Sequence, residues 1–162
     1  MHVYPADLAD LNRCCQLNGT YSTDYVWQMQ TREGEHRTDI RFDTVRLPRS
    51  MQVAYPRPAE ELPDHWQAEH CFLVAAPTDD EVAGFIDAHA RPDQQFLWVY
   101  NLIVDKRYRR QGVGSLLLES AGAWAEAQHL ETIMLEIQTN NHPAIAFARK
   151  HGIQSYGYHE RY

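Results

Sequence analysis

Cysteine is scarce in this sequence, with three in 162 residues: Cys14, Cys15 and Cys71. Their odd number and the lack of a C-x-x-C pair argue against a disulfide framework and against a cysteine zinc site. We therefore predict reduced, buried thiols in a cytoplasmic protein, and no metal site. The chain also lacks an apolar run of the ~20 residues that a membrane span needs. Its first residues show no basic segment followed by an apolar one, so no signal peptide is predicted.

Positive charge is scarce as well. The chain has 15 lysines and arginines against 22 acidic residues, and its formal net charge is −7. This balance argues against nucleic acid as the main partner. It is compatible with a cationic small molecule or a basic peptide, although many soluble proteins are equally acidic for solubility alone. The length suits a single domain around one core.

The first part of the chain mixes short elements. The pattern predicts a very short strand at 2–4, an amphipathic helix from Asp7 to about Leu17, and a hairpin of strands 25–30 and 38–47. Four prolines follow the hairpin and interrupt regular structure there: Pro48, Pro56, Pro58 and Pro63. The segment 18–68 has no repeat and no recognisable motif.

The second part alternates more regularly. Three apolar strands separated by short turns predict an antiparallel meander, at 70–76, 81–89 and 95–104. The elements after it are a helix to about 129, a strand at 132–138, a helix at 143–151 closed by Gly152, and a strand at 154–162. The strand-helix-strand passage 96–138 predicts a right-handed crossover between parallel strands. We therefore predict an α/β fold with a mixed, mostly antiparallel sheet.

A glycine-containing loop joins the third strand to the helix, with the pattern Arg109-x-x-Gly112-x-Gly114. Glycines at a helix start let the first-turn amides of residues 111–115 approach an anion, and neighbouring guanidinium groups add positive charge. The loop therefore predicts a pyrophosphate site. A P-loop would need Lys-Ser or Lys-Thr after the glycines, and a dinucleotide fingerprint would need glycine at Leu117. A glycine-rich turn with exposed arginines would show the same pattern.

A second motif follows at the expected distance. Its pattern is E-x-x-x-x-N-x-x-A-x-x-x-Y-x-x-x-G-F, and the matching residues here are Glu136, Asn141, Ala144, Gly152 and Ile153. With both motifs in order, residues 69–161 resemble the GNAT N-acetyltransferases, and most closely the ribosomal-protein alanine and streptothricin acetyltransferases. The resemblance implies one GNAT-like domain over 1–162. In it, 1–68 is a variable acceptor-side region and 69–162 is the acetyl-CoA-binding core.

The resemblance also implies a reaction and its residues. Acetyl-CoA is the cosubstrate, and the acetyl group passes by direct attack to a primary amine of a small molecule or a peptide N-terminus, with no nucleic-acid or membrane partner. Glu136 is the expected catalytic base, although a strand glutamate can simply face solvent. Asn141 is expected to hold the pantetheine arm, or only to cap a helix. The expected coenzyme-binding residues are Leu102, Ile103, Val104, Arg109, Arg110, Gln111, Gly112, Val113, Gly114, Ser115 and Asn141.

Two departures from the family pattern leave alternatives open. Ala148 stands where many relatives carry a tyrosine that protonates the departing thiolate. The thiolate then leaves unaided, or Tyr100, Tyr156 or Tyr158 replaces that group, or the protein binds acyl-CoA without turnover. A nucleotide-phosphate binder would use the same loop. The usual last strand is missing from the sequence pattern: the sequence is trimmed, or a partner chain fills the gap, or the sheet stays split. Because an unfilled sheet edge favours association, we predict a homodimer.

Overall fold

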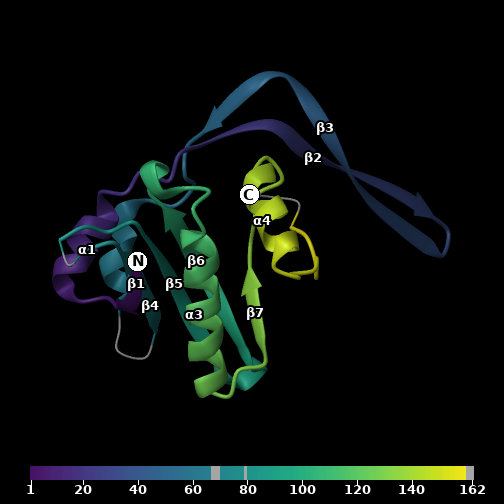
Figure 1. Cartoon of the computed structure of the whole chain (residues 1–162). Helices are drawn as coiled ribbons and strands as arrows, with labels where there is room; N and C mark the ends of the chain where they lie inside the picture. Colours follow the sequence, from purple (N-terminus) through teal and green to yellow (C-terminus); the bar gives the residue numbers. More distant parts are fainter. Residues whose placement is uncertain (67–69, 79, 160–162) are drawn as a thin grey trace. The chain divides into compact units, whose positions relative to one another are not determined.

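The computed structural model describes residues 1–66, 70–78 and 80–159 (Figure 1). The chain divides into two compact units. The first contains Met1–Thr20 and Ala54–Glu136, and the second contains Tyr21–Val53 and Ile137–Tyr162. Among the described residues, no helix has both the length and the apolar character that crossing a membrane requires.

A five-stranded sheet forms the centre of the first unit (Figure 1). Its strands lie in the order β1-β4-β5-β6-β7, where only the β6–β7 pair is parallel. Their bounds are His2–Pro5, Cys71–Ala76, Gly84–Arg91, Phe96–Val104 and Thr132–Leu135. The predicted meander, the parallel crossover and the mixed, mostly antiparallel sheet are confirmed.

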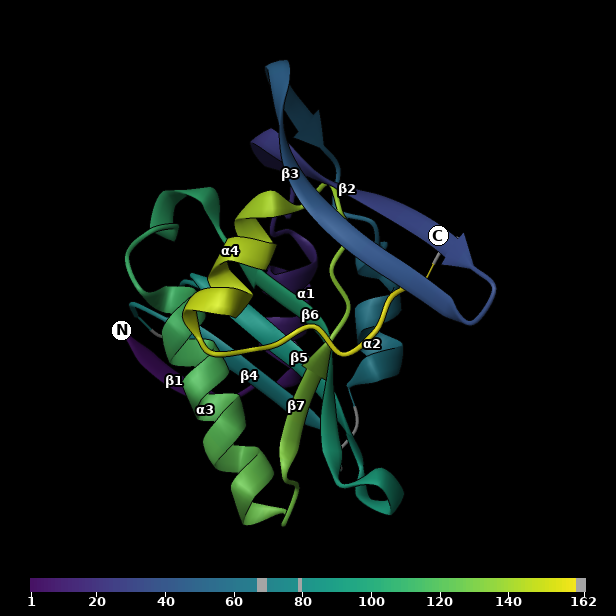
Figure 2. The same ribbon diagram turned by 90° about the vertical axis from the view of Figure 1, so that its right-hand side faces the viewer.

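Helices cover both faces of this sheet (Figure 2). On one face, α1 (Leu8–Cys15) and the short α2 (Leu62–His65) bury Leu11, Cys14 and Leu62 against alternate strand residues, including Phe72 and Phe85. Asp7 begins α1 with a capping box, because its side chain accepts from the Asp10 amide while Asp10 accepts from the Asp7 amide. On the other face lies α3, Val113–Ala127, with five buried apolar residues: Val113, Leu117, Leu118, Ala121 and Ala125. Single 3-10 turns occupy Ala59–Glu61, Pro92–Gln94 and Lys106–Tyr108.

Strand β6 is irregular in its middle. Asp87 and Ala88, which are consecutive on β5, pair with Asn101 and Val99, so Tyr100 is an extra residue on β6. Such a bulge turns two consecutive side chains to the same face of a sheet and bends the strand. The parallel ladder with β7 stops at the same point, since its last pair is Val99 with Leu135. The predicted strand 132–138 therefore ends three residues early.

The second unit consists of a long hairpin and a helix. Strands β2 (Tyr21–Gly34) and β3 (Arg37–Val53) extend well beyond the predicted ranges. Pro48 lies within β3, contrary to the expectation that it interrupts regular structure. The ladder is irregular between Thr23 and Tyr25, opposite Pro48, and a proline there costs no ladder hydrogen bond.

Helix α4 spans His142–Lys150 and is followed by Gly152 with φ +75°, as predicted. It contacts β2, where the Arg149 guanidinium lies 4.3 Å from the ring centre of Trp27. No strand follows α4 as far as residue 159, so the predicted strand 154–162 is wrong over 154–159. Residues 160–162 lie outside the described part.

Gly84 is the glycine whose replacement we expect to disturb the sheet most. A Cβ there would lie 2.6 Å from the Ile103 carbonyl oxygen and 3.2 Å from the Val104 Cα, so β6 would have to move. We expect Gly84→Ala to lower the free energy of unfolding by about 1–3 kcal/mol. Gly122→Ala is the matched control, since its Cβ would make only an ordinary 3.8 Å contact with Ile133. Because alanine is favoured over glycine inside a helix, Gly122→Ala should raise the free energy of unfolding by up to about 1 kcal/mol. Thermal unfolding of both variants checks this, and equal midpoints would contradict it.

Candidate active site

The predicted phosphate loop lies between β6 and α3 and has the backbone that the sequence indicates. Gly112 is the N-cap of α3 with φ +88°, a conformation that favours glycine, and no side chain of the residues that the structure describes caps the helix. The first intrahelical bond runs from the Leu116 amide to the Gly112 carbonyl, at 3.0 Å. The amides of the preceding first turn have no acceptor within the helix, and they lie at its positive end. This turn can bind an anion.

Beyond Val99, no strand in the described part of the chain pairs with the β7-side edge of β6 that leads into the loop. The Asp105 amide donates to Ala83 on the β5 side, so by strand alternation the main chain of Ile103 also faces β5. The main chains of Leu102 and Val104 therefore face the opposite edge, where pairing with β7 has already ended. Of the three predicted residues, Leu102 presents its main chain to this edge and Val104 presents its N–H, since the Val104 carbonyl oxygen accepts from Arg109 at 2.8 Å. Ile103 pairs with Phe85 and packs in the core.

The basic side chains of the loop have different roles. The Arg109 guanidinium donates to three carbonyl oxygens, those of Val104 (2.8 Å), Thr20 (2.8 Å) and Asn18 (3.0 Å). It therefore ties the loop to segment 18–20 and fixes the loop's shape. Arg107 forms ion pairs with Asp105 and Glu81, at 3.0 and 2.8 Å. Arg110 is exposed and has φ 64°, beside the start of α3.

The remaining predicted residues lie further along the chain. Glu136 is exposed and directly follows β7, as the last residue of the first unit. Asn141 belongs to the second unit and caps α4, where its side-chain oxygen accepts from the Ala144 amide at 3.1 Å. Ala148 is buried in α4. The predicted replacements Tyr156 and Tyr158 are 91% and 45% exposed, whereas Tyr100 is the extra residue of the β6 bulge.

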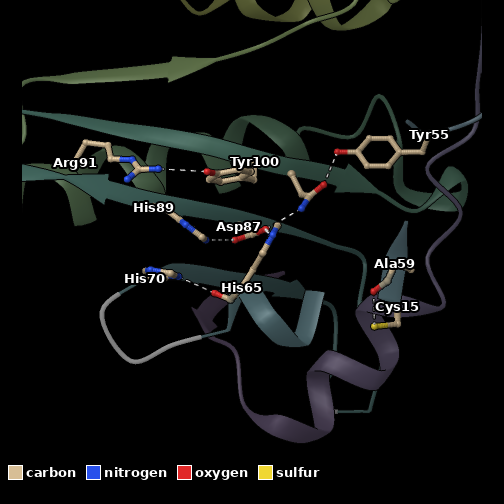
Figure 3. Close-up of polar contacts among 10 residues, drawn as sticks. Cys15, Tyr55, Ala59, His65, His70, Asp87, His89, Arg91 and Tyr100 are labelled. Atoms are coloured by element: carbon tan, nitrogen blue, oxygen red, sulfur yellow. Dashed lines mark hydrogen bonds and ion pairs between the residues drawn. The ribbon is translucent and has the colours of Figure 1, made fainter. Parts of the chain in front are cut away.

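Sequence reasoning missed a polar cluster on the α1–α2 face of the sheet, beside this bulge (Figure 3). Asp87 is wholly buried, and its Oδ2 lies 2.8 Å from His65 Nδ1 and 2.8 Å from Asn101 Nδ2, which donates to it. Asn101 accepts in turn from the Tyr55 hydroxyl at 2.9 Å. His89 completes the group on β5, with Nε2 3.6 Å from Asp87 Oδ1. No motif marks these residues, although the i, i+2 spacing of Asp87 and His89 places both on one strand face.

Burial is the largest cause of the pKa shifts of Asp87 and His89 in this cluster. It raises the pKa of Asp87, while hydrogen bonds from His65 and Asn101 oppose the rise. Burial and the nearby His70 and His65 lower the pKa of His89 to about 4, so His89 is neutral at pH 7. The His89 ring stacks on His70 at 3.6 Å between centroids and lies 4.4 Å from Tyr100.

A small cavity adjoins the cluster. It has a volume of about 60 Å³ and is lined by residues of α1, β5, β6 and the segment before α2, among them Cys14, Tyr55, Arg57 and Asn101. This volume holds a few water molecules and is too small for a drug-sized amine. The Tyr55–Asn101–Asp87 hydrogen bonds lead from its wall to the buried carboxylate.

An open strand edge that leads into an uncapped, glycine-containing helix start suits a protein that binds an extended ligand ending in phosphate. The sequence model of the acetyltransferase (GNAT) family matches residues 40–153, and the chain belongs to this family. Streptothricin acetyltransferase A of Bacillus subtilis (strain 168) is 42% identical over 53 residues, which make up 33% of this chain and 31% of that protein. The match thus spans about a third of that curated relative's length.

Solved structures show the same fold at low identity. A nourseothricin acetyltransferase has a TM-score of 0.78 at 22% identity, with 92% of this chain and 80% of that one covered. A second structure is that of a Bacillus anthracis str. Ames protein, provisionally named streptothricin acetyltransferase, in complex with acetyl coenzyme A. Its TM-score is 0.75 at 23% identity, with 93% of this chain and 82% of that one covered. The ribosomal-protein-S18-alanine N-acetyltransferase of Escherichia coli has a TM-score of 0.64 at 18% identity, with 93% of this chain and 76% of that one covered.

Proposed function

We propose that this protein is an acetyl-CoA-dependent N-acetyltransferase whose acceptor is a primary amine of a small molecule or a peptide N-terminus. The observation that carries the proposal is the continuity of the open β6 edge at Leu102 and Val104 with the uncapped start of α3 at Gly112. Family membership, and a structural neighbour in complex with acetyl coenzyme A, support the choice of ligand.

In this proposal the coenzyme lies along one continuous backbone surface. Its pantetheine amides pair with the main chain of Leu102 and with the Val104 N–H, and its diphosphate accepts from the amides of residues 111–115. The side chain of Arg109 contributes by holding the loop, as its three bonds to carbonyl oxygens indicate. Arg110 supplies charge from the surface. We assign Asn141 to the pantetheine arm on the family resemblance alone; its side-chain oxygen caps α4.

The proposed chemistry is direct attack. The acceptor amine must first lose a proton, because an alkyl ammonium with a pKa near ~10 is mostly protonated at pH 7. Glu136 is the proposed acceptor of that proton, directly or through water. The C–N bond then forms at the thioester carbon while a backbone N–H of β6 stabilises the oxyanion. The C–S bond breaks, the nitrogen loses its second proton to water, and the thiolate leaves and takes a proton from water or from Tyr100.

An amine panel tests the proposal. We expect release of free coenzyme A from acetyl-CoA, followed with a thiol reagent, to depend on both the protein and one class of amine. The panel contains streptothricin-type and aminoglycoside antibiotics, which are substrates named for structural relatives, and a peptide with an N-terminal alanine. Mass spectrometry of the acceptor should show a single added acetyl group. Thermal shift with acetyl-CoA and with ATP is the control, since stabilisation by ATP alone would overturn the proposal.

A second function has one observation in its favour. Ala148 is buried in α4 and cannot donate a proton, where many family members are expected to carry tyrosine. A protein that binds acyl-CoA without turnover would tolerate this loss. Saturable binding of acetyl-CoA, together with no thiol release across the whole panel, would favour that function over the first.

A further inference from the structure

The histidine–aspartate cluster, which we define as His65, Asp87 and His89, brings together three metal-ligating side chains from two elements. His65 is the last residue of α2, and Asp87 and His89 lie on β5 (Figure 3). One ligand atom from each lies within 4.8 Å of the other two. Two imidazole nitrogens and one carboxylate form a donor set that zinc and other divalent transition metals accept.

Two atoms of the cluster are unsatisfied. Asp87 Oδ1 and His89 Nε2 are both buried and have no hydrogen-bond partner among the described residues, and they face each other at 3.6 Å. This separation is too long for a hydrogen bond, and a bridging water would need about 4.5 Å. Leaving both atoms unpaired costs free energy. Two ligand atoms of one tetrahedral zinc ion, each about 2.0–2.2 Å from the metal, lie about 3.3–3.6 Å apart.

We propose that His65, Asp87 and His89 bind one divalent transition-metal ion, for which Zn²⁺ is the best fit. His65 would bind through Nδ1, His89 through Nε2, and Asp87 through its carboxylate. Without the ion, His65 Nδ1 lies at hydrogen-bond distance from Asp87 Oδ2, and a metal bound through Nδ1 would replace that contact. Three protein ligands leave a fourth position for water.

The surroundings already orient these ligands. Asn101 holds the second Asp87 oxygen at 2.8 Å, and His70 stacks on the His89 ring while its Nδ1 lies 2.8 Å from the His65 carbonyl oxygen. Such outer contacts fix ring orientation at metal sites. The His65 and His89 side chains are 19% and 15% exposed, so an ion can reach the cluster from solvent. Bound there, it would tie α2 to β5 next to the β6 bulge.

Titration of the chelator-treated full chain with Zn²⁺ tests the proposal. We expect saturable binding of one ion per chain by calorimetry, and a thermal midpoint that rises with Zn²⁺ concentration. Co²⁺ should give the visible absorption bands of a tetrahedral nitrogen–oxygen site. His65→Ala and His89→Ala each remove a ligand and should weaken Zn²⁺ binding by more than about 100-fold. His70→Ala removes a neighbour that orients the ligands and should weaken it by about 10-fold.

His36→Ala is the matched control, because His36 is 90% exposed on the hairpin and should not alter binding. Circular dichroism verifies that each variant is folded, and His89→Gln replaces His89→Ala if the latter is not. Wild-type protein that takes up no Zn²⁺, or cluster variants that bind it as tightly as wild type, would overturn the proposal. Because these measurements need no acetyl transfer, they stand apart from the proposed enzymatic activity.

Discussion

Gly112→Asp is expected to weaken acetyl-CoA binding by at least about 100-fold. The substitution places a carboxylate at the uncapped start of α3, beside the amides that we propose to bind the diphosphate. Two like charges about 4 Å apart repel by about 4 kcal/mol near a protein surface, and partial screening still leaves a large loss. A Cβ at this position meets no atom within 4 Å, so the side chain fits without a clash. Calorimetric titration with acetyl-CoA measures the loss.

The chain contains a matched control for backbone strain. Gly152 has φ +75° and equally open surroundings, but it follows α4 instead of preceding a helix. Gly152→Asp therefore incurs a similar conformational cost, of about 1–2 kcal/mol, without adding charge at the start of α3. Gly112→Ala carries the strain at the original position without the charge. Equal acetyl-CoA affinities for Gly112→Asp and Gly112→Ala would show that the loop does not bind the diphosphate.

The parts of the fold that the sequence predicted are those with strong local signals. The passage from β6 through Gly112 into α3 was predicted because apolar alternation changes to helical spacing at a glycine pair. The hairpin was underestimated because β2 and β3 expose side chains on both faces, so their ends show no apolar alternation. Pro48 was misinterpreted for a related reason, since a bulge in β3 is not visible in sequence.

The candidate site was only partly predictable. Its coenzyme side lies in one contiguous stretch, and the resemblance carried that prediction to individual residues. The histidine–aspartate cluster depends on contacts between His65 and Asp87, which are 22 residues apart, and no spacing rule connects them. The bulge at Tyr100 turns Tyr100 and Asn101 to the same face as Asp87, whereas strict alternation would have separated them.

Glu136→Gln should lower the turnover number for the best amine of the panel by about 10²- to 10⁴-fold, the usual contribution of a general base. Glutamine keeps the size of the side chain but cannot accept the ammonium proton. The residue is exposed and outside the sheet core, so stability and acetyl-CoA affinity should hardly change. Turnover and coenzyme affinity are measured separately, by thiol release at saturating acetyl-CoA and by calorimetry.

Glu131→Gln is the companion variant for that experiment. Glu131 is also exposed, and it precedes β7 where Glu136 follows it, so the two changes remove the same charge at opposite ends of one strand. A general loss of negative charge around β7 would affect both variants alike, whereas a base at the reacting amine would affect Glu136→Gln alone. If both variants keep wild-type turnover, the proton leaves through another group. The acidic and imidazole side chains beside the β6 bulge, those of Asp87, His65 and His89, would then be the next to substitute.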